Sequence, residues 1–434
     1  MPIKNAAPAA IAFACLIGTG LSIGVTLLNA GSVQAAPFSL NFDVLLADQG
    51  LDGVYRSRDF NGDGDANDAW ETTVYFNADN ASGLVNPSRN VFTILQSRSG
   101  HQYIGDGSSD SVYRLSDVNG DGDANDTGEA GLWFSEDNAA GLTLPTPNGI
   151  GEDRDNNIYI VNAGVGSRPA DGIYRTRDLN GDGDANDAGE ASLWLDLARL
   201  NPSASAFEVT FQGNVAFVAD TVGGDTNVIY RAEDNDGNGE ISDDEVSVFI
   251  DGNNPYGASI DFALAGDDTS LYIWEFLDIG APQSLFKLTD LDGSGIIDDV
   301  LEVSEIWDTT LLPSGFESFA GFGVAVDADG NIVLTSNGGD ANQDNIFLLQ
   351  DLNGDGDYRD AGETGIWLSR QANGSFPDRP RAVAFTSQNP VVAVAEPGSL
   401  PLLAIGLFSV LGLSGLAGRR DREGMSGSGL QIPV

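Results

Sequence analysis

The stretch "IYRTRDLNGDGDANDAGEASLWL", residues 173–195, places a loop rich in aspartate, asparagine and glycine between two apolar segments. Aromatic and β-branched residues bounded by Gly, Asn and Asp are typical of β-strands. The stretch therefore predicts a β-strand on each side of an acidic loop that begins at Asp178.

The same unit recurs along the chain. Acidic loops begin, at spacings of 58, 61, 56, 56 and 61 residues, at Asp59, Asp117, Asp178, Asp234, Asp290 and Asp351. Two further strand-like segments joined by turn residues precede each loop, as in "NGIGEDRDNNIYIVN" at 148–162. Each unit thus holds four strands, with the acidic loop between the third and the fourth. Because four-stranded units repeated around an axis form β-propellers, we predict an all-β, six-bladed β-propeller.

The two ends of the repeat predict how the ring closes. The first unit lacks a first strand, since only "SLNFDVLLAD" at 39–48 precedes its third strand. The segment "RAVAFTSQNPVVAV" at 381–394 aligns with "GFGVAVDADGNIVL" at 321–334. We therefore expect a C-terminal strand to complete the N-terminal blade, which removes open sheet edges. The pairs "GFGVAVDADGNIV" and "GIGEDRDNNIYIV" resemble blades of NHL and SMP-30-type propellers, which implies the fold and no catalytic residue.

The acidic loops have the composition of a calcium site. Like charges this close repel unless a cation lies among them, and Ca²⁺ prefers alternating oxygen donors with glycine at the turn. The loops resemble the calcium loops of EF-hand and dockerin proteins. That resemblance implies side-chain ligands at alternating positions, a backbone carbonyl at position 7 in the regular loops, and a closing acid. The implied ligands are Asp59, Asn61, Asp63, Asp65 and Glu71; Asp117, Asn119, Asp121, Asp123 and Glu129; Asp178, Asn180, Asp182, Asp184 and Glu190; Asp234, Asp236, Asn238, Glu240 and Glu245; Asp290, Asp292, Ser294, Asp298 and Glu302; Asp351, Asn353, Asp355, Asp357 and Glu363.

The loops depart from the EF-hand pattern in one respect. The closing acid stands at the twelfth position only in the fourth loop, as Glu245, and at the thirteenth position in the others. Asn186 or Asp187 is an alternative ligand in the third loop. Solvated Asn-Gly turns are the other interpretation, which accounts for one such loop but not for six. We predict about one structural calcium ion per blade and, because the flanks are strands, no helix–loop–helix sensor.

Composition excludes several functions. The chain has 65 acidic and 20 basic residues, a formal charge of −45, so it would repel DNA or RNA and nucleic acid is not a direct partner. His101 is the only histidine and Cys15 the only cysteine, which argues against a His-based triad, a poly-His zinc site and disulfides.

Both ends of the chain resemble targeting segments. Residues 1–35 predict a helical secretory signal, with a retained anchor as the alternative. Residues 395–422 resemble the PEP-CTERM sorting signal through Glu396, Pro397, Arg419 and Arg420, although Ala395 replaces the first proline and a polar tail, 423–434, follows. This resemblance implies a membrane-embedded hydrophobic helix and an exosortase-type processing enzyme; a plain single-span anchor is the alternative. The propeller is then expected over 36–394.

Three further patterns have two interpretations each. Basic residues three places before the loops could form an anion-binding ring, but we expect them to pack between blades: Arg56, Arg114, Arg175, Arg231 and Lys287. Aromatic residues of the fourth strands could stack on sugars, but we expect inter-blade core: Tyr75, Trp133, Trp194, Phe249, Trp307 and Trp367. Polar residues ending the second strands could form a ring at the channel, as in lactonase-like propellers, but we expect them to cap turns: Asp48, Asp106, Asn162, Asp220, Glu275 and Asn337.

The sequence therefore favours an exported, envelope- or surface-associated calcium-binding propeller that acts as a binding or structural module. The sorting-signal resemblance implies association with extracellular polysaccharide. The alternative is a metal-dependent hydrolase or lactonase-like enzyme with its site in the central channel. No catalytic residue and no organic cofactor site is identified.

Overall fold

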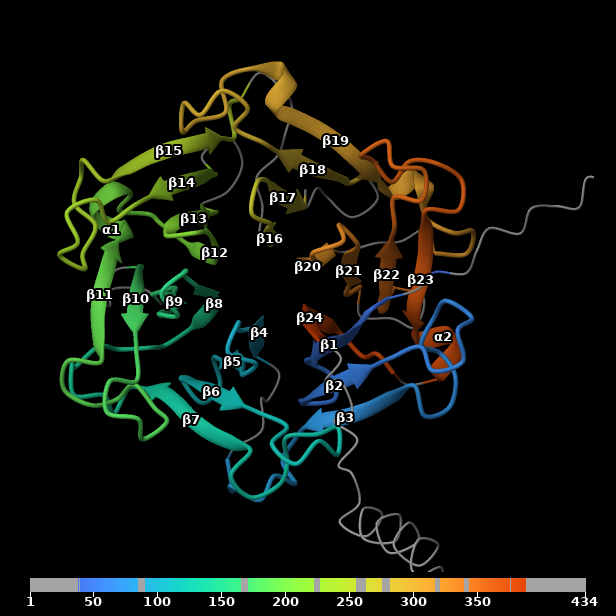
Figure 1. Ribbon diagram of the computed structural model, residues 1–434, viewed down its shortest axis with the longest axis horizontal. Coiled ribbons are helices and arrows are strands. Elements are labelled where there is room, and N and C mark those ends of the chain that lie inside the picture. The colour runs from blue at the N-terminus through green and yellow to red at the C-terminus, as the bar shows by residue number, and fades with distance from the viewer. Residues whose placement is uncertain are drawn as a thin grey trace, which may run out of the picture. The chain divides into compact units, whose positions relative to one another are not determined.

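The computed structural model describes residue 38 and residues 40–84, 90–164, 171–221, 227–254, 263–274, 282–316, 321–338, 343–374 and 376–387. Within these residues, 24 strands form six four-stranded antiparallel sheets arranged as blades around a central channel (Figure 1). The predicted six-bladed, all-β propeller is confirmed.

Each blade runs from an innermost strand at the channel to an outermost strand at the rim of the ring (Figure 1). In that order, the blades consist of β24 (Pro380–Ser387), β1 (Phe42–Asp48), β2 (Gly53–Ser57) and β3 (Thr72–Phe76); β4 (Val91–Gln96), β5 (Gln102–Asp106), β6 (Ser111–Leu115) and β7 (Ala130–Ser135); β8 (Pro147–Glu152), β9 (Ile158–Asn162), β10 (Gly172–Thr176) and β11 (Ala191–Asp196); β12 (Ala206–Gln212), β13 (Val215–Asp220), β14 (Val228–Ala232) and β15 (Val246–Asp251); β16 (Ala263–Gly266), β17 (Leu271–Trp274), β18 (Ser284–Leu288) and β19 (Val303–Asp308); and β20 (Gly321–Val326), β21 (Ile332–Ser336), β22 (Asn345–Leu349) and β23 (Thr364–Ser369). Within the described ranges the helical turns are short: α1 (Leu197–Leu200), α2 (Arg370–Asn373) and the 3₁₀ turns Val300–Glu302 and Thr309–Leu311.

The ring closes as the sequence predicts. β24 pairs antiparallel with β1, from Phe42 opposite Ser387 to Asp48 opposite Pro380. It is the innermost strand of the first blade and also packs against β4 and β20 of the two adjacent blades. The C-terminal strand therefore joins both ends of the repeat and leaves the first blade complete.

The core lies between neighbouring blades. Strands such as β5 and β9 are buried along their whole length because a sheet covers each of their faces. The six fourth-strand aromatics are buried. Trp133 Nε1 donates to Thr176 Oγ1 of the next blade at 3.0 Å, and Trp367 Nε1 donates to Ser57 Oγ of the first blade at 2.8 Å. The prediction that these aromatics form inter-blade core is confirmed.

The two predicted end segments are not among the residues that the structure describes. Residues 1–35 and 395–434, with the expected signal and sorting segments, lie outside the described residues. Among the described residues, none of the helices has the length and apolar character that a membrane crossing requires.

Candidate metal centres

All six acidic loops join the third and fourth strands of their blades, as predicted. Since the strands of every blade run up and down in the same order, the loops share the face of the ring at which the innermost strands end. In Figure 1 the loop between β2 and β3 lies at the outer edge of the ring, next to β23 of the neighbouring blade. The loops are therefore placed at junctions between blades.

The loop at 178–190 shows how the backbone is held. Asp178 accepts hydrogen bonds from the backbone N–H groups of Gly181 at 2.6 Å and Gly183 at 2.9 Å. Both glycines have positive φ, 82° and 101°, a conformation that residues with side chains avoid. Glu190 closes the loop by accepting from the Asp187 N–H at 3.1 Å. The first aspartate makes the same two bonds in the other loops, at Asp59, Asp117, Asp234, Asp290 and Asp351.

Carboxylates converge in four of the loops. In each, three acids offer ligand oxygens that all lie within 4.8 Å of one another. The groups are Asp121, Asp123 and Glu129; Asp182, Asp184 and Glu190; Asp234, Asp236 and Glu245; and Asp290, Asp292 and Glu302. Within the described residues, the loops at 59–71 and 351–363 do not bring three acids this close. In the first of these, Asn61 Nδ2 donates to Asp63 at 3.0 Å and to Asp68 at 2.6 Å.

The geometry differs from the predicted ligand set at two positions. At position 7 the prediction assigned the backbone carbonyl, whereas the side-chain carboxylates of Asp123 and Asp184 belong to the groups. At position 10 an aspartate lies beside the predicted ligands, since Asn180 Nδ2 donates to both Asp182 and Asp187. The sequence named Asp187 as an alternative ligand in the third loop, and the same aspartate recurs in three other loops as Asp68, Asp126 and Asp360. The other predicted ligands, Ser294, Asp298, Asn238 and Glu240 among them, lie on the loops outside the groups of three.

The loops hold their acids in two electrostatic environments. Burial, with the neighbouring carboxylate of Asp121, raises the pKa of Asp123, although the Asn125 N–H opposes the shift. The backbone N–H and hydroxyl of Ser242 donate to Glu245 and lower its pKa to about 2. Each carboxylate oxygen has two lone pairs, so an oxygen that accepts one N–H can still bind a cation. A divalent cation would offset the smaller part of this rise in the pKa of Asp123, which comes from the neighbouring carboxylates.

Each acidic loop also forms a hydrogen bond to the preceding blade. The eighth residue of the loop is buried, and its backbone N–H donates at 2.7–2.9 Å to a carbonyl of the preceding blade's outermost strand. The bonds are Ala66 to Trp367, Ala124 to Tyr75, Ala185 to Trp133, Ile241 to Trp194, Ile297 to Phe249, and Tyr358 to Ile306. We call this arrangement of loop positions 8 and 9 the clasp. Sequence reasoning missed it, although a small or apolar residue at position 8 of an otherwise polar loop was its signal.

The ninth residue extends the clasp through its side chain. Asn186 Oδ1 accepts from the Ser135 N–H at 3.0 Å, and Asn67 Oδ1 accepts from the Ser369 N–H at 2.8 Å. In the last loop the ninth residue is Arg359, whose Nη2 lies 3.0 Å from Asp308 Oδ2 of the preceding blade. A cation that orders the loop would therefore also order a junction between two blades.

The basic residues before the loops reach toward the next blade. Arg56 pairs with Asp43 at 2.5 Å and lies 3.4 Å from Asp117, the first residue of the following loop. A Cβ on Gly183 would lie 2.5 Å from Arg114 Nη2, so this head group packs closely against the third loop at a position whose φ of 101° already favours glycine. The prediction that these cations pack between blades is confirmed for Arg56 and Arg114.

Two of the polar residues that end the second strands, Asp48 and Asp106, cap turns as expected, whereas Asn162 donates to the Tyr174 hydroxyl. Asp48 accepts from the backbone N–H groups of Gly50 and Leu51, and Asp106 accepts from that of Ser108. Asp220 accepts from Ser205 N–H and Asn201 Nδ2 instead. Within the described residues, Asp106 and Asp220 join no group of three converging acids, and Glu275 lies outside those residues.

Comparison with known proteins shows similarity of fold alone. No family model matches the chain, and no curated protein matches its sequence. A chain of a nidogen/laminin complex is 11% identical with a TM-score of 0.48, over 79% of this chain and 98% of that one. A streptogramin B lyase is 16% identical with a TM-score of 0.44, over 81% and 86%. The calcium-binding protein regucalcin from Agrobacterium tumefaciens strain C58 is 13% identical with a TM-score of 0.38, over 60% and 70%.

Proposed function

We propose that this chain is an exported, envelope- or surface-associated propeller that binds about one calcium ion per blade and acts as a binding or structural module. The observation that carries the calcium site is the convergence of three carboxylates, with ligand oxygens within 4.8 Å of one another, in each of four loops. Clustered carboxylate and carbonyl oxygens on a glycine-containing loop are the donors that Ca²⁺ prefers. The formal charge of −45 also favours cation uptake.

Calcium acts here between blades. The loop that carries the carboxylates holds the preceding blade through the clasp, so an ion that orders the loop stabilises the junction. Extracellular calcium modules bind with dissociation constants of about 10⁻⁴ to 10⁻³ M. A site filled to about 100 times its dissociation constant adds about 2.7 kcal/mol to the free energy of unfolding. Even a few such sites rival the stability of a typical domain, which is about 5–15 kcal/mol.

Calcium titration of the whole protein tests the proposal. We expect calorimetry to count about one site per blade, and EGTA to lower the melting temperature by about 10 °C or more, because chelation removes a stabilising ion from several junctions at once. One or two sites, with a melting temperature that chelation leaves unchanged, would contradict a structural role for calcium.

A single-loop variant shows whether the converging acids are the ligands. Glu190→Gln keeps the shape of the side chain and one hydrogen-bond acceptor but removes a charge from the group with Asp182 and Asp184. We expect the number of sites to fall by one. Asp137→Asn, which removes a charge from an exposed aspartate outside the loops, is the matched control and should leave the count unchanged.

The proposed location rests on the two end segments. If residues 1–35 are a signal and 395–422 a sorting segment, the chain is exported, held at least transiently in the membrane, and processed by an exosortase-type enzyme. We expect the mature chain in the envelope or extracellular fraction with a mass that lacks residues 1–35. Co-sedimentation with extracellular polysaccharide, in calcium and in EGTA, tests the matrix association. A full-length chain found only in the cytoplasm would overturn this part.

A further inference from the structure

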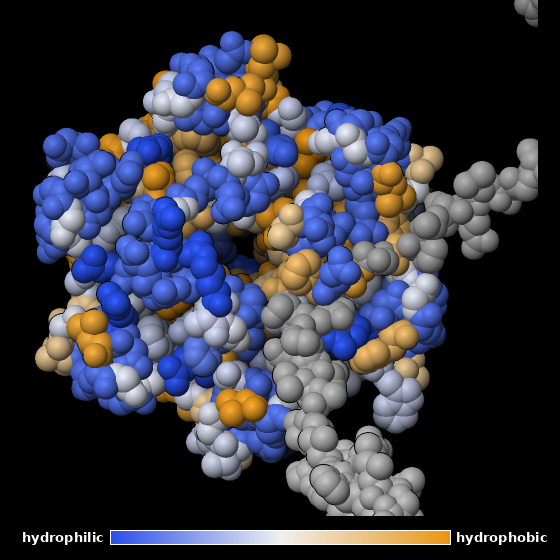
Figure 2. Space-filling model, viewed as in Figure 1, coloured by the Kyte–Doolittle hydropathy of each residue, from blue (hydrophilic) through white to orange (hydrophobic). Residues whose placement is uncertain are grey.

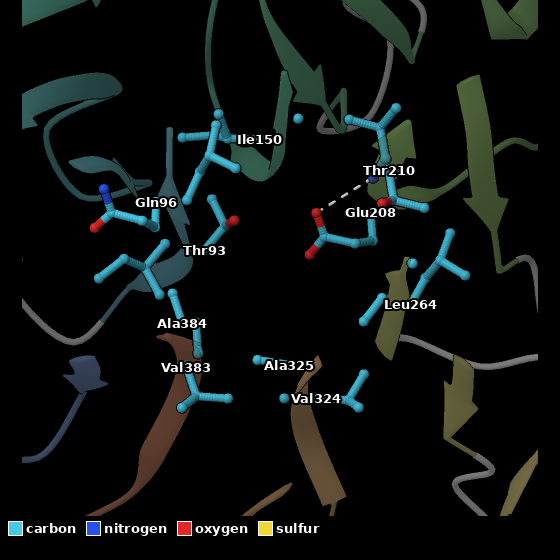
Figure 3. A pocket seen from close by; sticks show the side chains of 18 of the residues that line it. Thr93, Gln96, Ile150, Glu208, Thr210, Leu264, Val324, Ala325, Val383 and Ala384 are labelled. Atoms are coloured by element: carbon cyan, nitrogen blue, oxygen red, sulfur yellow. Dashed lines mark hydrogen bonds between the residues drawn. The ribbon is translucent and has the colours of Figure 1, made fainter. Parts of the chain in front are cut away.

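The innermost strands of the six blades enclose a cavity of about 310 Å³ along the axis of the ring. Figure 2 shows an opening at the centre of the ring, and Figure 3 shows the cavity wall from close by. Apolar side chains from separate blades line the cavity, namely Ile94, Ile150, Leu264, Val324 and Val383, and polar groups lie between them. The acidic loops take no part in this wall, so the cavity is independent of the calcium sites.

One arginine in the wall has an unusual environment. The Arg381 guanidinium stacks over the rings of Phe92 at 4.8 Å and Phe322 at 4.5 Å, contributed by the blades on either side of β24. Aromatic rings that stack on a guanidinium leave the N–H donors in its plane available to a ligand. Among the described residues, no carboxylate forms an ion pair with Arg381 and no side chain or carbonyl accepts its hydrogen bonds.

This arginine differs from three others that have acidic partners. Arg56, Arg58 and Arg370 each pair with a buried aspartate, in a chain that has 65 acidic residues and 20 basic ones. Burial without a counter-ion lowers the pKa of Arg381 to about 10, which still leaves the side chain charged at neutral pH. An unpaired charge that is largely withdrawn from water is costly, and an anionic ligand would supply the missing partner.

The opposite wall contributes an acid that does not neutralise this charge. Around the ring β24, β4, β8, β12, β16 and β20 pack in succession, so β12 lies across the channel from β24. Figure 3 shows the Glu208 carboxyl of β12 projecting into the cavity, where its Oε1 accepts from the Val209 N–H at 3.2 Å. Burial raises the pKa of Glu208 to about 8, so at neutral pH this carboxyl is mostly uncharged. Glu208 therefore does not cancel the charge of Arg381. Two further charged residues line the cavity, Arg98 and Glu152, and the charge of Arg98 acts on the Glu152 carboxyl.

We propose that the central channel binds a small organic carboxylate, whose carboxylate group pairs with the in-plane N–H donors of Arg381 while its apolar body lies along the wall. A single guanidinium suits one carboxylate, since two parallel N–H···O bonds match its two oxygens. Polyanions are disfavoured because only two arginines, Arg98 and Arg381, line the cavity of a chain whose formal charge is −45. The cavity of about 310 Å³ limits the ligand to a small molecule.

The test uses the full chain in millimolar calcium, with benzoate as the probe and benzamide as its uncharged counterpart. Calorimetry should find one benzoate site per chain, and benzamide should bind about tenfold more weakly or worse because it lacks the charge. Equal affinity for the two compounds would overturn the proposal. So would the lack of any heat or melting-temperature change with benzoate at about 20 mM.

Variants locate the site. Arg381→Met removes the charge and keeps an apolar stem between Phe92 and Phe322, and should lose benzoate binding by about tenfold or more. Arg154→Met, which removes a charge from an exposed arginine outside the cavity, should bind benzoate as the unmodified protein does. Unchanged affinity in Arg381→Met would refute the assignment. If that variant does not fold, the benzoate–benzamide comparison on the unmodified protein still decides the question.

Discussion

Residue 70 shows how the backbone constrains one position of the acidic loop. Position 12 is Gly128, Gly189 and Gly362 in three loops, with φ of 89°, 91° and 97°. The first loop adopts the same conformation with Trp70, at φ 81°. This conformation costs a residue with a Cβ about 1–2 kcal/mol. Trp70 gains little from burial in return, because its side chain is 85% exposed.

We therefore expect Trp70→Gly to raise the free energy of unfolding by about 1 kcal/mol, because glycine adopts positive φ without strain. Urea denaturation in calcium measures the change. Trp70→Ala is the control: it removes the exposed ring but keeps the Cβ, and should leave stability within about 0.5 kcal/mol. Equal stabilisation by both substitutions would assign the effect to the exposed indole rather than to backbone strain.

Glu208 provides a pH-dependent prediction. Burial, opposed by the N–H groups of Val209 and Ile150, raises its pKa from 4.5 to about 8. Between these values the unfolded chain releases a proton that the folded chain keeps, so this residue lowers stability progressively as pH rises through that window.

The substitution Glu208→Gln should remove this pH-dependent loss of stability. We expect the variant and the unmodified protein to have similar free energies of unfolding near pH 4.5. Near pH 8 the variant should be more stable, by up to about 4 kcal/mol. Urea denaturation at about pH 5 and about pH 8.5 measures the difference. Stability differences that are the same at both pH values would contradict the raised pKa.

At the scale of the element, the acidic loop is both a candidate metal site and an inter-blade connection. Its first aspartate and closing glutamate hold the loop backbone, while positions 8 and 9 bond to the preceding blade. In the third loop, Asn186 bonds to Ser135 and Trp133 of the second blade. Loss of this side chain leaves a backbone N–H of that blade without its acceptor.

We expect Asn186→Ala to lower the free energy of unfolding by about 1–2 kcal/mol. Leu179→Ala in the same loop is the matched control, since Leu179 is 61% exposed and should change stability by less than about 0.5 kcal/mol. Thermal melts of both variants in calcium measure the difference. If both variants lost a similar amount of stability, the loop would be sensitive to any substitution. The loss in Asn186→Ala would then not be assigned to the clasp.

At the scale of the whole molecule, β24 determines whether the ring is closed. It supplies the innermost strand of the first blade and contacts β4 and β20 of the adjacent blades. Without β24, β1 becomes an open edge strand. The apolar cores on the two sides of β24 also lose the side chains that it contributes.

Two truncations test this role. A chain that ends at residue 387 keeps β24 and should melt cooperatively, as the full chain does. A chain that ends at residue 379 loses β24 and should show a broad transition or aggregate, because closure removes edges that otherwise pair with other chains. Cooperative melting of the shorter chain at an unchanged temperature would refute the closing role of β24.

The sequence by itself determined the repeat, the strand order within each blade, the closing strand and the positions of the acidic loops. These follow from local patterns, because alternation of residues such as those around Tyr174, and the glycines at Gly181 and Gly183, specify strands and turns without reference to distant contacts. Tertiary structure decided which groups meet. Ala185 bonds to Trp133 of the preceding blade, and residues far apart in sequence enclose Arg381, because ring closure, and no local pattern, brings those strands together.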